Sequence, residues 1–181
     1  MTEKHYLKLL YPSVNLPLYA TNGAAAMDLE AYIPPGSTVT HYTENNEAVS
    51  GRIIDGFMLY PGVRALIPTG VSIKVAKNHE LQIRSRSGLS LKNGIIVANS
   101  PATIDSDYTG EIFIILRNIS SVPFLVAHEA RIAQAVIAPY VRLSPENTDF
   151  LCHNSPQIAD IVETERGAGG FGSTGLMSKK S

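Results

Sequence analysis

Residues 94–118, GIIVANSPATIDSDYTGEIFIILRN, decide the fold, because two apolar runs flank a polar loop. The runs at 95–98 and 112–116 are short and rich in β-branched residues, which is typical of buried strands. We predict that they pair as a hairpin, so that rigid strands position the chemistry of the loop between them.

The loop of this hairpin contains groups suited to a flat polar ligand and to the activation of a water molecule. Asn99 carries an amide that can donate and accept hydrogen bonds, and Tyr108 carries a flat ring. Asp105 and Asp107 carry carboxylates two residues apart, on one face if the loop is extended. The same residue types also favour turns, so the loop taken alone is better explained as a turn.

The size and composition of the chain indicate one globular domain. With 181 residues, of which 44% are hydrophobic and 17% charged, the chain can bury a sizeable core. Fifteen basic residues against sixteen acidic ones give a net charge of −1, which provides no overall field for a nucleic-acid backbone. Any anion that binds must therefore be small and held by local groups.

The chain shows no sign of a membrane span or a signal peptide, because its apolar runs are short and its N-terminus is charged. We expect a cytoplasmic protein, or a nuclear one if the source is eukaryotic or viral, with no membrane or nucleic-acid partner. A single cysteine, Cys152, excludes an internal disulfide. The histidines form no HxE pattern, which argues against the zinc site of nucleobase deaminases.

Alternation with a period of two dominates the remaining apolar segments, and helical periodicity is scarce. Strands are predicted over 6–10, on both sides of a Pro-Thr-Gly turn within 63–75, over 122–127 and over 131–139. Residues 41–60 begin polar and end apolar, which favours a surface hairpin over a second domain. The chain is therefore predicted to be all-β, a barrel or a jelly roll with a short helix.

A turn rich in serine and arginine follows a strand that is predicted to end at Arg84. Ser85, Arg86, Ser87 and Gly88 form this turn, and the next residues can form the short helix. Arginine, hydroxyl groups and free backbone N–H groups suit a phosphate group. They equally suit a solvated basic turn, and the pattern alone does not decide between the two.

Polar side chains interrupt two further apolar runs. Asp28 lies in the small and apolar segment 22–36, so it needs either a hydrogen-bonding partner or a nearby cation. Arg131 and Gln134 interrupt the last predicted strand, so they must find partners or face a site.

Residues 166–175, RGAGGFGSTG, form a glycine-rich stretch near the C-terminus. A flexible tail would explain the glycines, but it has no need of an arginine and a phenylalanine. A mobile arm that closes over a ligand would use all of these residues. Phe171 would stack on a flat ring, while Arg166, Ser173 and Thr174 would hold phosphate.

In their order along the chain, five segments resemble the motifs of the trimeric, all-β dUTPase family. They are AAMDLEA (25–31), RSGLSLKNG (86–94), NSPATIDSDYTGE (99–111), RIAQ (131–134) and RGAGGFGSTG (166–175). The resemblance covers most of the chain and implies a distorted jelly roll or β-barrel with a flexible C-terminal arm. We expect one domain over 1–165, with 41–60 as a surface insertion, and a mobile arm over 166–181.

The resemblance also implies an activity, the hydrolysis of dUTP to dUMP and pyrophosphate with Mg²⁺, in a homotrimer whose subunits share the active sites. It makes Asp105 the catalytic base that activates water, and it places Asp28 near Mg²⁺ through water. Asn99 and the hairpin backbone would recognise uracil, and Tyr108 would pack against the sugar. The implied substrate-binding residues are Arg86, Ser87, Gly88, Asn99, Ala102, Ile104, Tyr108, Gln134, Arg166, Phe171, Gly172, Ser173 and Thr174.

Four positions depart from the family pattern. Ala26 and Ala102 replace usual glycines, Ser85 stands where proline is common, and Ala130 lacks the usual acidic side chain. If the backbone at Ala102 needs a positive φ, strain of about 1–3 kcal/mol would weaken base selectivity or affinity.

Two other functions stay open. A dCTP deaminase-like enzyme would share the architecture of the superfamily, but Tyr108 beside the two aspartates and the arm with Phe171 argue against it. A nucleotide-gated interaction protein would use residues 41–60 to bind a protein partner, although surface loops of this kind are commonly tolerated without a function.

Overall fold

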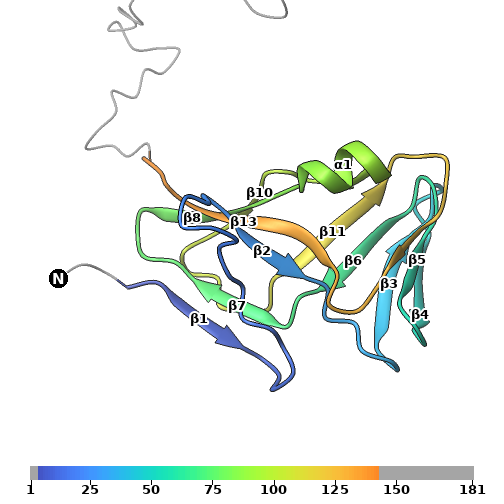
Figure 1. Cartoon of the computed structure of the whole chain (residues 1–181), viewed down its shortest axis with the longest axis horizontal. Helices are drawn as coiled ribbons and strands as arrows, with labels where there is room; N and C mark the ends of the chain where they lie inside the picture. Colours follow the sequence, from blue (N-terminus) through green and yellow to red (C-terminus); the bar gives the residue numbers. More distant parts are fainter. Residues whose placement is uncertain (1–3, 143–181) are drawn as a thin grey trace, which may run out of the picture. The chain divides into compact units, whose positions relative to one another are not determined.

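A computed structural model describes residues 4–142, which form thirteen strands and one short helix (Figure 1). The strands are β1 (Tyr6–Leu9), β2 (Met27–Glu30), β3 (Thr38–Tyr42), β4 (Ala48–Arg52), β5 (Phe57–Leu59), β6 (Arg64–Pro68), β7 (Val71–Lys74), β8 (His79–Arg84), β9 (Ile95–Val97), β10 (Ala102–Ile104), β11 (Phe113–Asn118), β12 (Phe124–Val126) and β13 (Arg131–Pro139), and the helix is α1 (Ser87–Asn93). None of the helical segments in this part of the chain is long and apolar enough to cross a membrane.

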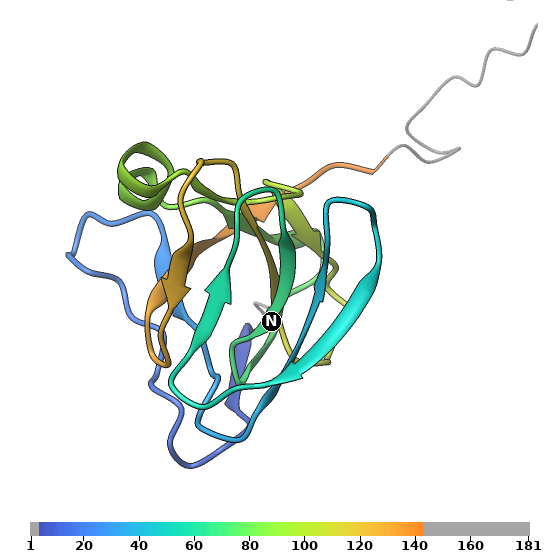
Figure 2. The same ribbon diagram turned by 90° about the vertical axis from the view of Figure 1, so that its right-hand side faces the viewer.

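Two larger sheets and two small ones make up the described part of the chain. The five-stranded sheet has the order β4-β3-β6-β11-β9, and the four-stranded sheet has the order β10-β8-β13-β2. The pairs β1-β7 and β12-β5 form the small sheets, and all of these pairings are antiparallel. Figure 2 shows the strands curving around a common interior. The prediction of an all-β fold with a short helix is confirmed, and the predicted arm over 166–181 lies outside the described residues.

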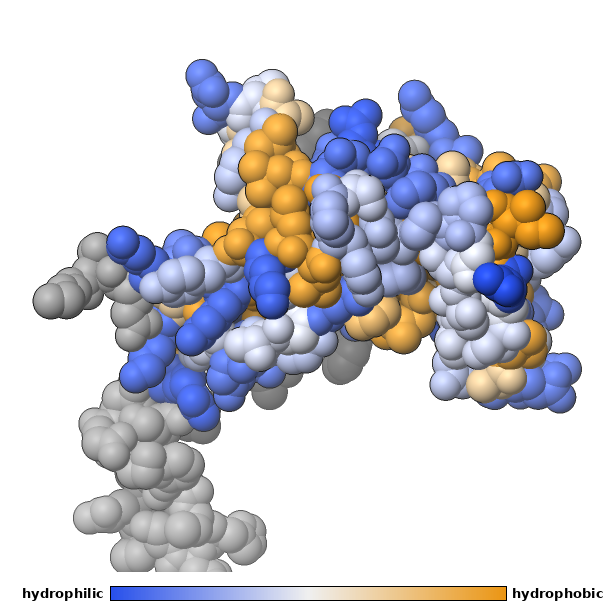
Figure 3. Space-filling view, turned by 90° about the horizontal axis from the view of Figure 1, so that it is seen from below, coloured by the Kyte–Doolittle hydropathy of each residue, from blue (hydrophilic) through white to orange (hydrophobic). Residues whose placement is uncertain are grey.

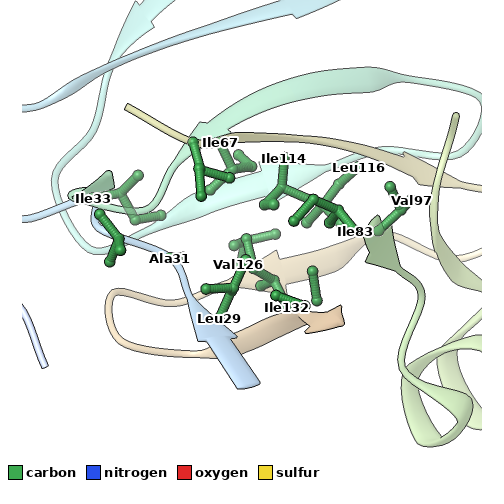
Figure 4. Packing of buried hydrophobic residues seen from close by; sticks show 14 of the residues in the cluster. Leu29, Ala31, Ile33, Ile67, Ile83, Val97, Ile114, Leu116, Val126 and Ile132 are labelled. Atoms are coloured by element: carbon green, nitrogen blue, oxygen red, sulfur yellow. The ribbon is translucent and has the colours of Figure 1, made fainter. Parts of the chain in front are cut away.

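The core is built by strands that alternate buried and exposed side chains. Strand β11 pairs with β6 so that Ile114 lies opposite Ile67, and both are buried. These side chains and that of Leu116 point toward Leu29 and Ile132 of the four-stranded sheet (Figure 4). Burying a large aliphatic side chain contributes about 1.5–3 kcal/mol. The two larger sheets are therefore held together by their inner faces.

Helix α1 confirms the predicted short helix, but it begins at Ser87, so Ser87 and Gly88 belong to the helix and not to the preceding turn. It ends at Gly94, whose φ of 64° places it in the left-handed conformation that favours glycine. The Gly94 N–H caps the carbonyl oxygens of Leu89 and Ser90, and its own carbonyl accepts a hydrogen bond from the backbone N–H of Ile119 at 2.9 Å. These contacts fix the direction in which the chain enters β9.

The predicted central hairpin is confirmed in its strands and differs in its loop. Strand β9 pairs with β11, and Val97 lies opposite Leu116. The loop between them does not simply project, because its residues Ala102–Ile104 form β10, which pairs with β8 in the other larger sheet. The segment therefore crosses from one sheet to the other and is fixed in its middle as well as at its ends.

Residues 41–60 fall into two parts with different surroundings. All five residues of β4 are exposed, and this strand forms an edge of the five-stranded sheet. By contrast, Ile53 and Leu59 are buried in the core, and β5 pairs with β12. The continuous exposed run therefore ends before Ile53, and beyond it buried side chains alternate with exposed ones such as Ile54 and Tyr60. Its role in binding a protein partner stays a prediction.

Apolar side chains also reach the surface of the molecule. Figure 3 shows an apolar patch on one face. Exposed apolar residues include Leu16 and Leu18 in the loop after β1. Elsewhere, Tyr42, Leu66 and Ile115 help to line a cavity of about 190 Å³ on the five-stranded sheet. Extensive apolar surface of this kind commonly marks contact sites between proteins.

Candidate active site

The carboxylate of Asp28 holds two arginine side chains. The Nε atom of Arg86 donates a hydrogen bond to Oδ1 at 2.9 Å, and Nη1 of Arg131 donates to Oδ2 at 3.2 Å. The partner that the sequence required for Asp28 is thus a pair of guanidinium groups. Because one carboxylate faces two guanidinium groups, the cluster carries a net positive charge and can attract a small anion.

The guanidinium group of Arg86 is anchored on one side and available on the other. Besides its bond to Asp28, it donates from Nη1 to the carbonyl oxygen of Arg131 at 3.0 Å. Its third nitrogen, Nη2, has no hydrogen-bonding partner within residues 4–142, and 27% of the side chain is exposed. An arginine held in this way presents a preformed donor edge to a phosphate group.

Gln134 connects the last strand to the turn before α1. It lies opposite Asp28 across the β2-β13 pair, and its Nε2 atom donates to the carbonyl oxygen of Ser85 at 2.8 Å. The structure therefore brings Asp28, Arg86, Arg131 and Gln134 together from segments that are distant in the sequence.

Gly88 in the first turn of α1 has no structural need to be glycine. Its φ is not positive, and beyond its chain neighbours and its own helix backbone a Cβ atom added there would meet no described atom within 4 Å. A helical glycine is about 0.5–1 kcal/mol less favourable than alanine. The space beside Gly88 is open to solvent, next to the exposed Ser87, and the role of Gly88 in substrate binding stays a prediction.

The first half of the hairpin loop is anchored on the four-stranded sheet. Ala102 lies opposite Ile83, and Ile104 lies opposite Leu81, while Asn99 is exposed just before this strand. The backbone of Ala102 is extended and lacks a positive φ. The strain that a positive φ would have imposed on alanine is therefore absent, and the departure from glycine leaves the strand intact.

The second half of the loop turns at Asp105. The carbonyl oxygen of Asp105 accepts a hydrogen bond from the backbone N–H of Tyr108 at 3.1 Å. The extended arrangement considered for Asp105 and Asp107 is thus not formed. The Asp105 carboxylate is exposed, and no side chain or backbone group of residues 4–142 hydrogen-bonds it. It is therefore free to bind a water molecule.

The ring of Tyr108 lies against the backbone of its own loop. Its hydroxyl group donates to the carbonyl oxygen of Glu111 at 2.7 Å, and 42% of the residue is exposed. A Cβ atom at Gly110 would lie 2.5 Å from the Tyr108 oxygen, so glycine is needed for this packing. The loop thus holds the ring in place while leaving part of it open.

The turn between β6 and β7 fastens the end of the loop, and sequence reasoning missed this role. The hydroxyl group of Thr69 donates to the carbonyl oxygen of Ile112 at 2.7 Å. The backbone N–H of Gly70 donates to the Glu111 carboxylate, also at 2.7 Å. The sequence did contain a sign of this role. Thr69 lies between two apolar runs, so its hydroxyl group needed a hydrogen-bonding partner.

The remaining candidate residues belong to the glycine-rich arm. Arg166, Phe171, Gly172, Ser173 and Thr174 lie outside the described residues.

One cavity borders the described site and touches only part of it. A cavity of about 410 Å³ touches Asp28 and Arg131 on the side of the loop at 13–20, but Arg86, Gln134 and the hairpin do not line it. The positive cluster and the anchored hairpin together form an open site, and its charges and hydrogen-bonding groups suit a small anionic ligand with a flat group.

Comparisons with known proteins agree on one family. The dUTPase family model matches residues 53–175. A deoxyuridine 5'-triphosphate nucleotidohydrolase of Roseobacter denitrificans is 43% identical over 163 residues, which are 90% of this chain and 88% of that protein.

Two phage proteins illustrate the similarity to solved structures. The Staphylococcus bacteriophage 80alpha dUTPase with dUPNHPP has a TM-score of 0.65 at 22% identity and covers 97% of this chain and 100% of its own. A mutant dUTPase from phage phi11 of S. aureus was described for the coordination of a structural Mg(II) ion. It has a TM-score of 0.60 at 17% identity and covers 82% of this chain and 98% of its own.

This chain belongs to the dUTPase family. The matched residues include four of the five segments that carry the resemblance, and the first segment, 25–31, precedes them. The likeness to the phage structures confirms the predicted jelly-roll fold. The family and the names of its relatives favour the hydrolase over the deaminase alternative.

Proposed function

We propose that this protein hydrolyses dUTP to dUMP and pyrophosphate. The observation that carries the proposal is that, in a chain of the dUTPase family, a turn suited to phosphate lies beside a hairpin suited to a nucleoside. The turn with Arg86 and the hairpin with Asn99 are held on the adjacent strands β8 and β10. One element suits phosphate groups and the other suits a base and a sugar.

The phosphate groups would bind at the positive cluster. The free edge of Arg86 would donate to phosphate oxygens, supported by Gln134 and by the Ser87 hydroxyl. Arg131 adds positive charge, and Gly88 allows the nucleotide to approach the backbone. Asp28 contributes by holding both arginines in position.

The base and the sugar would bind along the hairpin. Asn99 and the backbone at Ala102 and Ile104 offer donors and acceptors that can match the edge of uracil. Tyr108 would pack against the deoxyribose, where a 2′-hydroxyl would collide with the ring. Because Thr69 and Gly70 fasten the end of this loop, the ring position is set by the sheet.

The Asp105 carboxylate would act as the base. It takes a proton from a water molecule while the water oxygen forms a bond to the α-phosphorus. The bond between the α-phosphorus and the oxygen that bridges to the β-phosphate breaks in line, and its electron pair leaves with pyrophosphate. Dissociation of the proton from Asp105 then restores the carboxylate.

A magnesium ion fits this site if the nucleotide supplies most of its ligands. No group of three or more acidic, histidine or cysteine side chains within residues 4–142 could hold a metal by itself. Asp28 is engaged by two arginines, so it would reach the ion through water, an arrangement that suits the slowly dehydrating Mg²⁺. The bound ion would neutralise phosphate charge and orient the triphosphate.

We also propose that the active protein is a homotrimer with shared sites. The open site, the exposed apolar residues and the cavity near Leu66 are the features that support association between copies. In this assembly residues 1–165 form the domain, and residues 166–181 form an arm that closes over the nucleotide with Phe171 and Arg166.

A substrate panel tests the proposed activity. In the presence of Mg²⁺ we expect pyrophosphate release from dUTP, with kcat/KM lower by about 10⁴-fold for dCTP, because mismatched buried polar groups stay unpaired. dTTP and UTP should also be poor substrates, and chelation of Mg²⁺ should stop turnover. Comparable rates for all four nucleotides would contradict the proposal, and ammonia release from dCTP would favour the deaminase alternative.

Replacement of Gly88 by alanine separates stability from substrate binding. Since the added methyl group meets no described atom beyond its own helical segment, the variant should be as stable as the original or about 0.5–1 kcal/mol more stable. The methyl group should nevertheless keep phosphate from the backbone and raise KM for dUTP by roughly tenfold to a hundredfold. Thermal unfolding and steady-state kinetics measure the two effects. A stable variant with an unchanged KM would remove Gly88 from the phosphate site.

A further inference from the structure

Ser85 joins three separate segments through its three polar groups. Its hydroxyl oxygen accepts a hydrogen bond from the backbone N–H of Val97 at 2.9 Å, and its own N–H donates to the Ser100 hydroxyl at 3.3 Å. Its carbonyl oxygen accepts a hydrogen bond from Gln134 at 2.8 Å. We propose that Ser85 is a positioning residue that fixes the base-binding hairpin relative to the phosphate-binding turn, and thereby supports both turnover and base selectivity. This inference rests on the proposed function.

The location of Ser85 allows it to act on both halves of the site. Arg86 follows it directly in the chain, so the position of Ser85 affects the backbone that carries the anchored guanidinium group. On the hairpin side, its two partners Val97 and Ser100 lie on either side of Asn99, the residue expected to contact the base. A shift of Ser85 would therefore move Arg86 and Asn99 relative to each other.

Serine at this position provides contacts that proline lacks. The family pattern commonly has proline here, and proline has neither a hydroxyl group nor a backbone N–H. The two bonds to the hairpin would then be lost, while the carbonyl bond to Gln134 would remain. In this chain the link between turn and hairpin thus depends on the hydroxyl group and the backbone N–H of a half-buried serine.

Two substitutions isolate the hydroxyl group. Ser85→Ala keeps the backbone groups but leaves the N–H of Val97 without its acceptor, and a buried donor without a partner is costly. Ser85→Thr keeps the oxygen atom and all three bonds. Ser50→Ala is the matched control, because Ser50 in β4 makes one hydroxyl contact, with Thr40 at 3.0 Å, in the exposed hairpin.

Kinetics with dUTP and dCTP test the proposal. In Ser85→Ala we expect kcat/KM for dUTP to fall by about tenfold to a hundredfold, since small misplacements of reacting groups have effects of this size. The ratio of kcat/KM for dUTP to that for dCTP should fall as well. Ser85→Thr should recover most of both quantities, and Ser50→Ala should match the original protein.

Two kinetic results would overturn the proposal. One is a Ser85→Ala variant with unchanged kcat/KM and selectivity, whether or not its melting temperature falls. The other is a threonine variant as impaired as the alanine variant, which would show that the hydroxyl oxygen is not the determinant.

Amide hydrogen exchange provides a readout that does not depend on turnover. The N–H of Val97 should exchange faster in Ser85→Ala than in Ser85→Thr or the original protein, and residues 99–104 should lose protection. Unchanged exchange over 97–104 would overturn the positioning role. If the original protein fails to hydrolyse dUTP, the proposed function fails, and the exchange result still decides whether Ser85 positions the hairpin.

Discussion

Asp105→Asn should lower kcat for dUTP by about 10²–10⁴-fold, the range typical for the loss of a general base. Asparagine has nearly the same shape but cannot accept the proton of the attacking water. Because no described residue hydrogen-bonds this carboxylate, the substitution leaves the turn with Tyr108 intact. The affinity for a non-hydrolysable dUTP analogue should therefore be retained, as measured by calorimetry.

The neighbouring Asp107 provides the matched control for this prediction. Asp107→Asn makes the same chemical change in the same exposed loop, two residues further along. We expect a much smaller change in kcat from it. Equal losses in the two variants would indicate a general effect of charge in the loop, and full turnover in Asp105→Asn would show that another group activates the water.

Mixing two inactive variants should restore activity if subunits share their sites. One variant carries Asp105→Asn, and the other ends at Glu165 and lacks the arm. Each homotrimer should be impaired by about 10²-fold or more, because one lacks the base and the other cannot close over the substrate. In trimers formed from equal amounts of both variants, about a quarter of the sites would be complete, with Asp105 from a truncated subunit and the arm from an Asp105→Asn subunit.

The measurement is kcat after the two variants are unfolded and refolded together, with each variant refolded alone as the control. The molar mass by light scattering should correspond to three chains before and after mixing. A mixture whose activity equals the average of its components would contradict shared sites, even if the trimeric mass is confirmed.

Local signals in the sequence were sufficient for most strands. The two strands around Pro68 and Gly70, for example, alternate with a period of two and are separated by residues that favour a turn, and the structure contains them as β6 and β7. The short helix was also predictable, because Gly94 provides its stop signal. Such elements depend on residues that are close together in the chain.

Non-local pairing explains what the sequence did not reveal. Strand β10 is only three residues long, and its strand character comes from its partner β8. The partners of Ser85 lie 12, 15 and 49 residues away, and those of Asp28 lie 58 and 103 residues away. Sequence reasoning could state that Asp28 needed a partner, but the choice of two arginines depends on how the sheets assemble.

Among residues 4–142, strand β10 is the terminal strand of its sheet, so in this part of the chain one of its edges carries backbone N–H and C=O groups without a neighbouring strand. A uracil ring placed against this edge would occupy the position of the missing strand. Base choice would then depend on the register between β10 and β8 more than on the side chains of Ala102 or Thr103. If β10 slipped by one residue along β8, the backbone N–H and C=O groups that now face β8 would face the base instead. Substitutions that preserve the register should therefore preserve the choice of base.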